Sequence, residues 1–138
     1  MDIELLYPLV TEAIRRAETL EDLGAPGTRS AYLDVSLLEE KIAEVLPISD
    51  PEGALARGGA VRAALAAKEV ARARQLCERF LMEAEADSEL RTELRDLLKQ
   101  AECSMAERYP RVAAKIGILE VWRLARVLTE QGAPFPIG

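Results

Sequence analysis

The stretch PRVAAKIGILEVWRLARVLTEQ, residues Pro110–Gln131, decides the fold that we expect for this chain. It opens with a proline, which suits a first helical turn, and it stops before Gly132, which suits a left-handed cap. Its apolar residues form two strips on different sides of the helix. One strip holds Ala114, Gly117, Val121, Leu124, Ala125 and Leu128, and the other holds Val112, Ile116, Leu119 and Val127. A helix with two apolar sides needs neighbours on two sides, so we predict the central or interface helix of an all-α protein.

The size and composition of the chain are those of one globular domain. A chain of 138 residues can bury a stable core without disulfides or a structural metal, so we expect a single helical domain over 1–138. Hydrophobic residues make up 49% and charged residues 30%, a balance that excludes wholesale disorder. Cys77 and Cys103 are too few for a disulfide framework, which predicts a reducing compartment. The first residues carry acids where a secretory signal carries Lys or Arg, and no apolar run suits a membrane span. We therefore expect a cytoplasmic protein without a membrane partner.

The charged residues add information about partners and origin. The net charge of −6 argues against general affinity for a nucleic-acid backbone, although one local basic face is compatible with it. Arginine outnumbers lysine 14 to 4, and asparagine is absent. Few amides and many charges are typical of thermophiles, while a GC-rich bacterial genome favours the same excess of Arg and Ala. Both origins fit a bacterial-type cytoplasm.

Start and stop signals divide the first half of the chain. An apolar stripe that begins near Pro8 predicts a helix over 3–23, followed by a loop over 24–34. Ser36 and Glu39 have the spacing of a capping box, so the next helix should begin there.

The second half should contain a long helical hairpin. Asp50 and Pro51 provide an N-cap and a first-turn proline for a helix to about Glu85, whose weak point is Gly58-Gly59. The linker to the next helix is short, which favours an antiparallel pair. The expected helices cover 3–23, 36–46, 51–85, 88–108 and 110–131, with an irregular tail over 132–138. We therefore predict a compact bundle of about five helices.

Candidate metal ligands are limited to carboxylates, because the chain has no histidine. Glu18 with Glu21, and Glu93 with Asp96, each place two acids one helical turn apart, which suits Mg²⁺. These pairs resemble the Glu-x-x-Glu and Glu-x-x-Asp pairs of the all-α nucleotide pyrophosphohydrolases of the MazG and dimeric dUTPase kind. The resemblance implies Mg²⁺-dependent nucleotide hydrolysis, but the two pairs lie about 70 residues apart, farther than that motif allows. A solvated charged face explains the same residues.

A basic stripe is expected on the helix over 51–85. Arg57, Lys68, Arg72 and Arg79 fall on one side of it, opposite the apolar residues. This stripe could bind an anion or a nucleic acid. Acids are interleaved with it and aromatic residues are scarce, so salt bridges to neighbouring acidic helices or to a partner are the competing interpretation.

The last part of the chain supplies the expected partner surface. Its apolar side chains away from the main strip are Ile116, Leu119, Trp122, Phe135 and Ile137. Aromatic anchors of this kind are common in protein interfaces. Taken together, the sequence predicts a non-catalytic protein–protein interaction or regulatory module without a cofactor, which binds a second copy of itself, another protein, or both. A Mg²⁺-dependent nucleotide hydrolase and a nucleic-acid-binding protein remain the alternatives.

Overall fold

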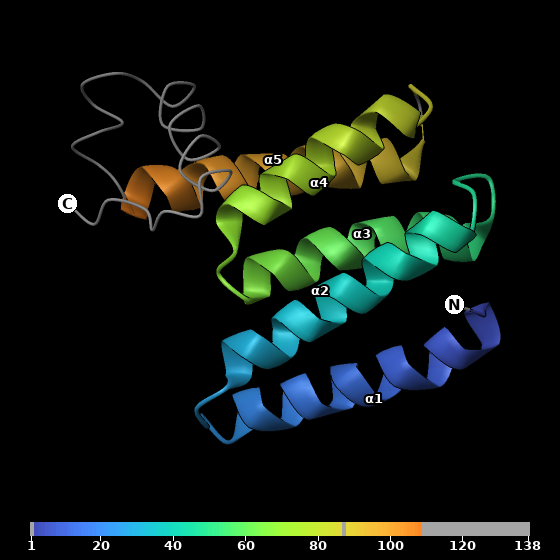
Figure 1. Cartoon of the computed structure of the whole chain (residues 1–138). Helices are drawn as coiled ribbons and strands as arrows, with labels where there is room; N and C mark the ends of the chain where they lie inside the picture. Colours follow the sequence, from blue (N-terminus) through green and yellow to red (C-terminus); the bar gives the residue numbers. More distant parts are fainter. Residues whose placement is uncertain (1, 87, 109–138) are drawn as a thin grey trace, which may run out of the picture.

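The helices of this chain follow one another with short connections (Figure 1). The structure, a computed structural model, describes residues 2–86 and 88–108. These residues contain helices and no strand, which confirms the all-α prediction. The helices are α1 Ile3–Asp22, α2 Thr28–Val45, α3 Pro51–Ala66, α4 Val70–Glu83 and α5 Glu89–Arg108. The expected helix over 110–131, the tail over 132–138 and the expected partner surface lie outside the described residues.

The helices are stacked in chain order. α1 packs on α2, α2 packs on α3, and α3 packs on both α4 and α5. Figure 1 shows α1 on one side of the stack and the α4–α5 pair on the other, with α2 and α3 between them. None of the described helices is long and apolar enough to cross a membrane.

The centre of the described fold is α3, which contacts α2, α4 and α5 and leaves one side, with Leu55 and Arg62, exposed. Six of its eight buried residues are small: Gly53, Ala56, Gly58, Ala60, Ala63 and Ala64. Small side chains make α3 a thin helix, so neighbouring helices can approach its backbone closely. Gly53 is the tightest position, because a Cβ atom there would lie 2.1 Å from the carbonyl oxygen of Pro47. Among the described residues, the centre is thus α3, while the expected central helix over 110–131 lies outside them.

The second helix begins earlier than expected. α2 starts at Thr28, directly after Gly27 in a left-handed conformation (φ 90°), so the expected loop over 24–34 is a loop only over 24–27 and is wrong over 28–34. Ser36 does not cap a helix. It is buried in the middle of α2, where its hydroxyl donates to the carbonyl oxygen of Ala60 at 2.7 Å. Ala31 and Val35 extend the buried stripe of α2 back from Ile42, and this packing outweighs the capping-box pattern.

The expected helix over 51–85 is two helices, and the break is not at Gly58-Gly59. Lys68, with φ 63°, ends α3 in the left-handed conformation that usually favours glycine. The amides of Lys68 and Glu69 donate back to the carbonyls of Leu65 and Ala64 and so close the helix end. The two glycines stay helical. They lie under the carboxylates of Glu93 and Glu39, which a Cβ atom would meet at 2.6 and 3.0 Å, so their role is close approach.

Helices α4 and α5 run antiparallel beside each other. The thiol of Cys77 lies 3.5 Å from the carbonyl oxygen of Leu94, and the Arg91 guanidinium donates to the carbonyl of Leu81 at 3.0 Å. Residues earlier in α4 thus face residues later in α5. The first arm of this pair is shorter than expected, because α3 forms a separate helix. Cys77 is buried and Cys103 is exposed.

Candidate functional site

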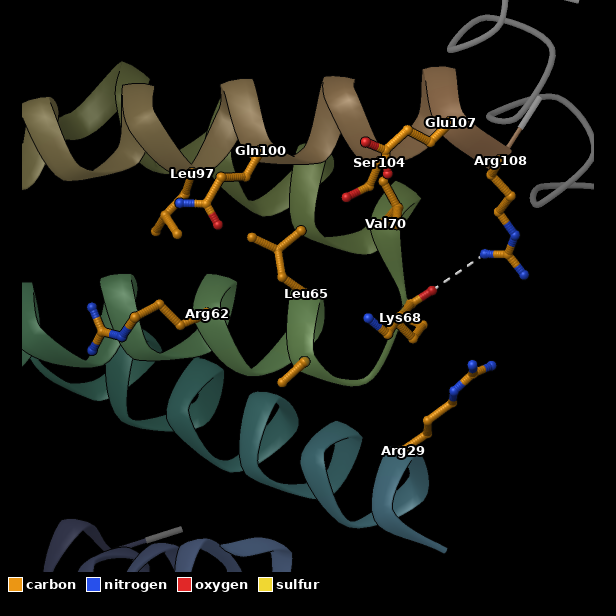
Figure 2. Close-up of a pocket in the computed structure, with 11 residues that line it drawn as sticks. Arg29, Arg62, Leu65, Lys68, Val70, Leu97, Gln100, Ser104, Glu107 and Arg108 are labelled. Atoms are coloured by element: carbon orange, nitrogen blue, oxygen red, sulfur yellow. Dashed lines mark hydrogen bonds between the residues drawn. The ribbon is translucent and has the colours of Figure 1, made fainter. Parts of the chain in front are cut away.

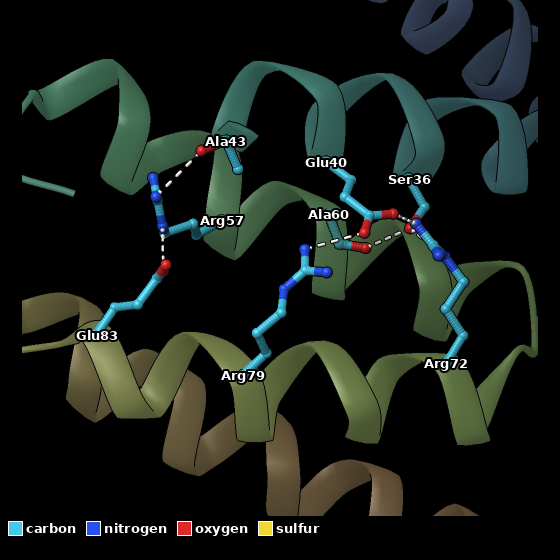
Figure 3. Close-up of polar contacts among 8 residues, drawn as sticks. All are labelled: Ser36, Glu40, Ala43, Arg57, Ala60, Arg72, Arg79 and Glu83. Carbon is cyan, nitrogen blue, oxygen red and sulfur yellow. Dashed lines mark hydrogen bonds and ion pairs between the residues drawn. The ribbon is translucent and has the colours of Figure 1, made fainter. Parts of the chain in front are cut away.

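Two of the four expected anion-binding residues are held in ion pairs between α2 and α4. Glu40 accepts a hydrogen bond from Arg72 at 2.7 Å and another from Arg79 at 2.9 Å (Figure 3). Arg72 also donates to the hydroxyl of Ser36 at 3.1 Å. This is the arrangement expected of salt bridges to a neighbouring acidic helix. Both guanidinium groups are therefore part of the α2–α4 contact.

Arg57 of α3 is a structural residue. Its side chain is 6% exposed, and it donates to Glu83 at 2.8 Å and to three backbone carbonyls. These carbonyls belong to Ala43, Leu46 and Gly53. The first two lie at the end of α2, whose last carbonyls have no partner within the helix. A ligand could reach Arg57 only by displacing these bonds, so Arg57 does not share an open basic face with the other three residues.

The candidate metal ligands do not come together. Glu18 and Glu21 lie exposed on α1, and Glu21 accepts from the hydroxyl of Tyr32 at 3.1 Å. Glu93 and Asp96 lie on α5, at the opposite side of the stack, and Glu93 is ion-paired with Arg62 (Figure 1). Across residues 2–86 and 88–108, no three Cys, Asp or Glu side chains are placed to hold a metal ion.

The remaining expected residue, Lys68, lines a groove between the end of α3 and the second half of α5. We call this cavity of about 760 Å³ the α3–α5 groove. Its lining residues are Arg29, Arg62, Leu65, Ala66, Lys68, Val70, Leu97, Gln100, Ser104, Glu107 and Arg108. The groove exists because Lys68 turns the chain, so that α4 leaves the end of α3 in a new direction.

Positive charge surrounds this groove. Arg29, Arg62, Lys68 and Arg108 come from four different segments, and Glu107 is the one acid in the lining. Arg62 is paired with Glu93, and Arg108 donates to the carbonyl of Lys68 at 3.4 Å. Within the described part of the chain, the side chains of Arg29 and Lys68 have no acidic partner. Such a concentration of cations is unexpected in a protein with a net charge of −6.

The floor of the groove is partly apolar. Leu65 of α3 is half-buried, Val70 of α4 and Leu97 of α5 are buried, and Gln100 and Ser104 of α5 add polar groups (Figure 2). The same view shows Arg62 at one end and Arg29 with Arg108 at the other. A partly apolar floor with charged edges is able to hold a ligand that carries both kinds of group.

Sequence reasoning found Lys68 but missed the groove. Arg29 falls in a segment that was expected to be a loop, and Arg62 carried no pattern of its own. The groove depends on the left-handed turn at Lys68, which no glycine or proline marks. The side chains that line it come together only through the packing of α3 against α5.

Cys77 does not offer a reactive thiol. Its side chain is buried between α4 and α5, and burial, with a smaller contribution from the charge of Glu78, raises its pKa to about 12. It therefore stays protonated at neutral pH, as expected of a core cysteine.

Removing the Arg57 guanidinium should destabilise the fold strongly. We expect Arg57→Met to lower the free energy of unfolding by about 3 kcal/mol, because it leaves two α2 carbonyls and Glu83 without their partner. Arg79→Met is the matched control, since both Arg57 and Arg79 lie over the Phe80 ring but Arg79 is half exposed. It should cost less than about 1 kcal/mol. Urea unfolding measures both values, and equal losses would contradict the structural role of Arg57.

The neighbours Glu39 and Glu40 should respond to pH in opposite ways. Burial raises the pKa of Glu40, but hydrogen bonds and charges from Arg72 and Arg79 outweigh burial, so the pKa lies below its usual 4.5. Ionised Glu40 therefore stabilises the fold above that pH, and the contribution is lost as the pH falls through the folded-state pKa. Burial raises the pKa of Glu39 above 4.5, and the nearby Arg62 only partly offsets it. Ionised Glu39 thus destabilises the fold at neutral pH, and protonation removes that penalty.

We expect Glu40→Gln to lower the melting temperature at pH 7 and Glu39→Gln to leave it unchanged or raise it. Both differences from the unsubstituted protein should shrink as the pH falls below the usual carboxyl value. Thermal unfolding followed by circular dichroism across acidic and neutral pH provides the measurement. Parallel pH profiles for the two variants would show that the two carboxylates do not differ in this way.

Comparison with known proteins gives no match: no family model fits the chain, and no curated protein or solved structure is significantly similar to it. No activity or partner can therefore be transferred to this chain by similarity. The geometry of the α3–α5 groove and its charges supply the basis for a functional proposal.

Proposed function

We propose that this chain is a non-catalytic interaction module that binds another protein in the α3–α5 groove. The observation that carries this proposal is the combination of a partly apolar floor, to which Leu65 contributes most, with an edge of arginine and lysine side chains. Protein interfaces combine an apolar centre with a polar rim in the same way, and arginine is enriched in them. Guanidinium groups stay protonated in proteins and offer fixed donors, so they serve binding better than proton transfer.

The other functional predictions have less support. The two acid pairs of the hydrolase alternative lie on opposite sides of the stack. The basic stripe of the nucleic-acid alternative is divided between a buried arginine and ion pairs with Glu40. Self-association through Ile116, Leu119 and Trp122 stays a prediction, because these residues lie outside the described part of the chain.

Charge reversal in the groove should abolish partner capture. The double variant Arg29→Glu with Lys68→Glu places two acids in the groove, whereas Arg16→Glu with Lys41→Glu makes the same charge change at exposed positions elsewhere. Full-length proteins, immobilised and exposed to lysate of the host, are compared by mass spectrometry. We expect the unsubstituted protein and the control to retain the same proteins, and the groove variant to lose them. Melting temperatures check that all three are folded.

The proposal fails if the groove variant, folded and stable, retains the same proteins as the unsubstituted chain. It also fails if the groove variant and the control lose the captured proteins equally, because the effect would then come from net charge and not from the groove.

A further inference from the structure

We infer that the α3–α5 groove recognises an acidic, amphipathic segment of the partner, in which carboxylates flank aliphatic side chains. This inference rests on the proposed function and names the chemistry of the ligand. Three features of the groove carry it: the sign of its charge, the way the charge is distributed, and the apolar surface between the charges.

The sign of the charge selects an anionic occupant. Four cations line the groove against the single acid Glu107. Arg29 and Lys68 are exposed, and no carboxylate among residues 2–86 and 88–108 pairs with them. An approaching acidic segment can form ion pairs with these two cations, whereas a basic segment is repelled. The net charge of −6 means that this attraction is local to the groove and does not come from the whole surface.

The same criterion disfavours the rest of this chain as the occupant. Residues 109–138 begin next to Arg108, so distance would be no obstacle. They contain four basic residues, Arg111, Lys115, Arg123 and Arg126, and two acidic ones, Glu120 and Glu130. Their formal charge of +2 has the same sign as the groove. Like charges oppose this pairing, and a ligand from outside the chain fits better.

The distribution of the cations favours an extended ligand over a compact anion. A phosphate is held when several donors converge on one point. Here Arg62, which pairs with Glu93, lies at one end of the groove and Arg29 with Arg108 at the other, with Leu65 between them (Figure 2). A compact anion would leave the distant cations and Leu65 unused. A peptide engages the unpaired Arg29 and Lys68 through carboxylates and Leu65 through aliphatic side chains, and a carboxylate near Arg62 shares that guanidinium with Glu93.

The composition of the groove also determines how binding of the acidic segment should depend on salt concentration. Guanidinium groups bind carboxylates through paired N–H donors, while Lys68 acts as a point charge. Because these side chains are exposed, salt should screen the attraction. The contribution of Leu65, in contrast, should persist at high salt, because burial of apolar surface does not depend on opposite charges.

The test uses a fluorescein-labelled, end-capped peptide of repeated Glu-Leu-Leu-Glu units and the full-length protein, with anisotropy as the readout. We expect binding that weakens at least ~10-fold for Arg29→Glu with Lys68→Glu, and that stays unchanged for Arg16→Glu with Lys41→Glu. The matching peptide with Gln in place of Glu should bind at least ~10-fold more weakly. Raising NaCl from about 0.05 M to about 0.3 M should weaken the binding of the acidic peptide several-fold. The Leu65→Ser variant should bind the peptide more weakly at both salt concentrations.

Four results would overturn the inference. The Glu and Gln peptides could bind equally, which would remove the role of charge. Inorganic pyrophosphate could bind in the groove while the peptide does not, which would indicate a compact anion. The peptide could bind the groove variant as tightly as the unsubstituted protein, which would place its site elsewhere. The emission of Trp122, the only tryptophan in the chain, could shift in the peptide-free groove variant at an unchanged melting temperature, which would point to residues 109–138 as the occupant.

The outcome separates this inference from the proposed function. If the groove variant loses its captured proteins but the acidic peptide does not bind, the groove is a protein-binding site for another chemistry, and the inference alone falls. If capture does not depend on the groove, the proposed function falls with it.

Discussion

The close approach of α2 and α5 to the backbone of α3 is the constraint on which the rest of the structure depends. Alanine and glycine make this helix thin, so α2 comes near enough for the Ser36 hydroxyl to reach the carbonyl of Ala60. On other sides, the carboxylates of Glu39 and Glu93 lie directly over Gly59 and Gly58. Larger side chains at these positions would push the neighbours away, because a packed interior has no spare volume. The stack therefore has its tightest contacts around α3.

Charged side chains add contacts between helices at places that the apolar core does not fill. Glu40 joins α2 to α4 through two arginines, and Arg57 joins the end of α2 to Glu83 of α4. Buried and half-buried guanidinium groups thus hold together helices that are not neighbours in the chain. The open groove has a different origin. It lies where α3 ends, because the left-handed residue Lys68 turns α4 away and leaves the end of α3 facing α5.

The sequence predicted those elements whose packing is one-sided. α1 and α5 each have one apolar stripe and clear end signals, and both were predicted within a residue or two. α3 has no such stripe, because its buried side includes Arg57 and two glycines while Leu55 is exposed, and therefore periodicity could not identify it as the central helix. Lys68 ends α3 without glycine, and Ser36 imitates a cap while lying in a helix interior. Of the groove, the sequence indicated only Lys68 and the buried side of α5. Its other residues meet through tertiary packing, which local patterns do not encode.

Amide hydrogen exchange of the intact protein tests the central role of α3 most directly. Helices packed on several sides open only when the whole protein unfolds, whereas a helix packed on one side can open locally. The amides of Ala60, Val61 and Ala64 should therefore exchange at the rate of global unfolding. The amides of α1, whose main helix contact is with α2, should exchange faster. Exchange of α3 by local opening, while α1 stays protected, would contradict the account.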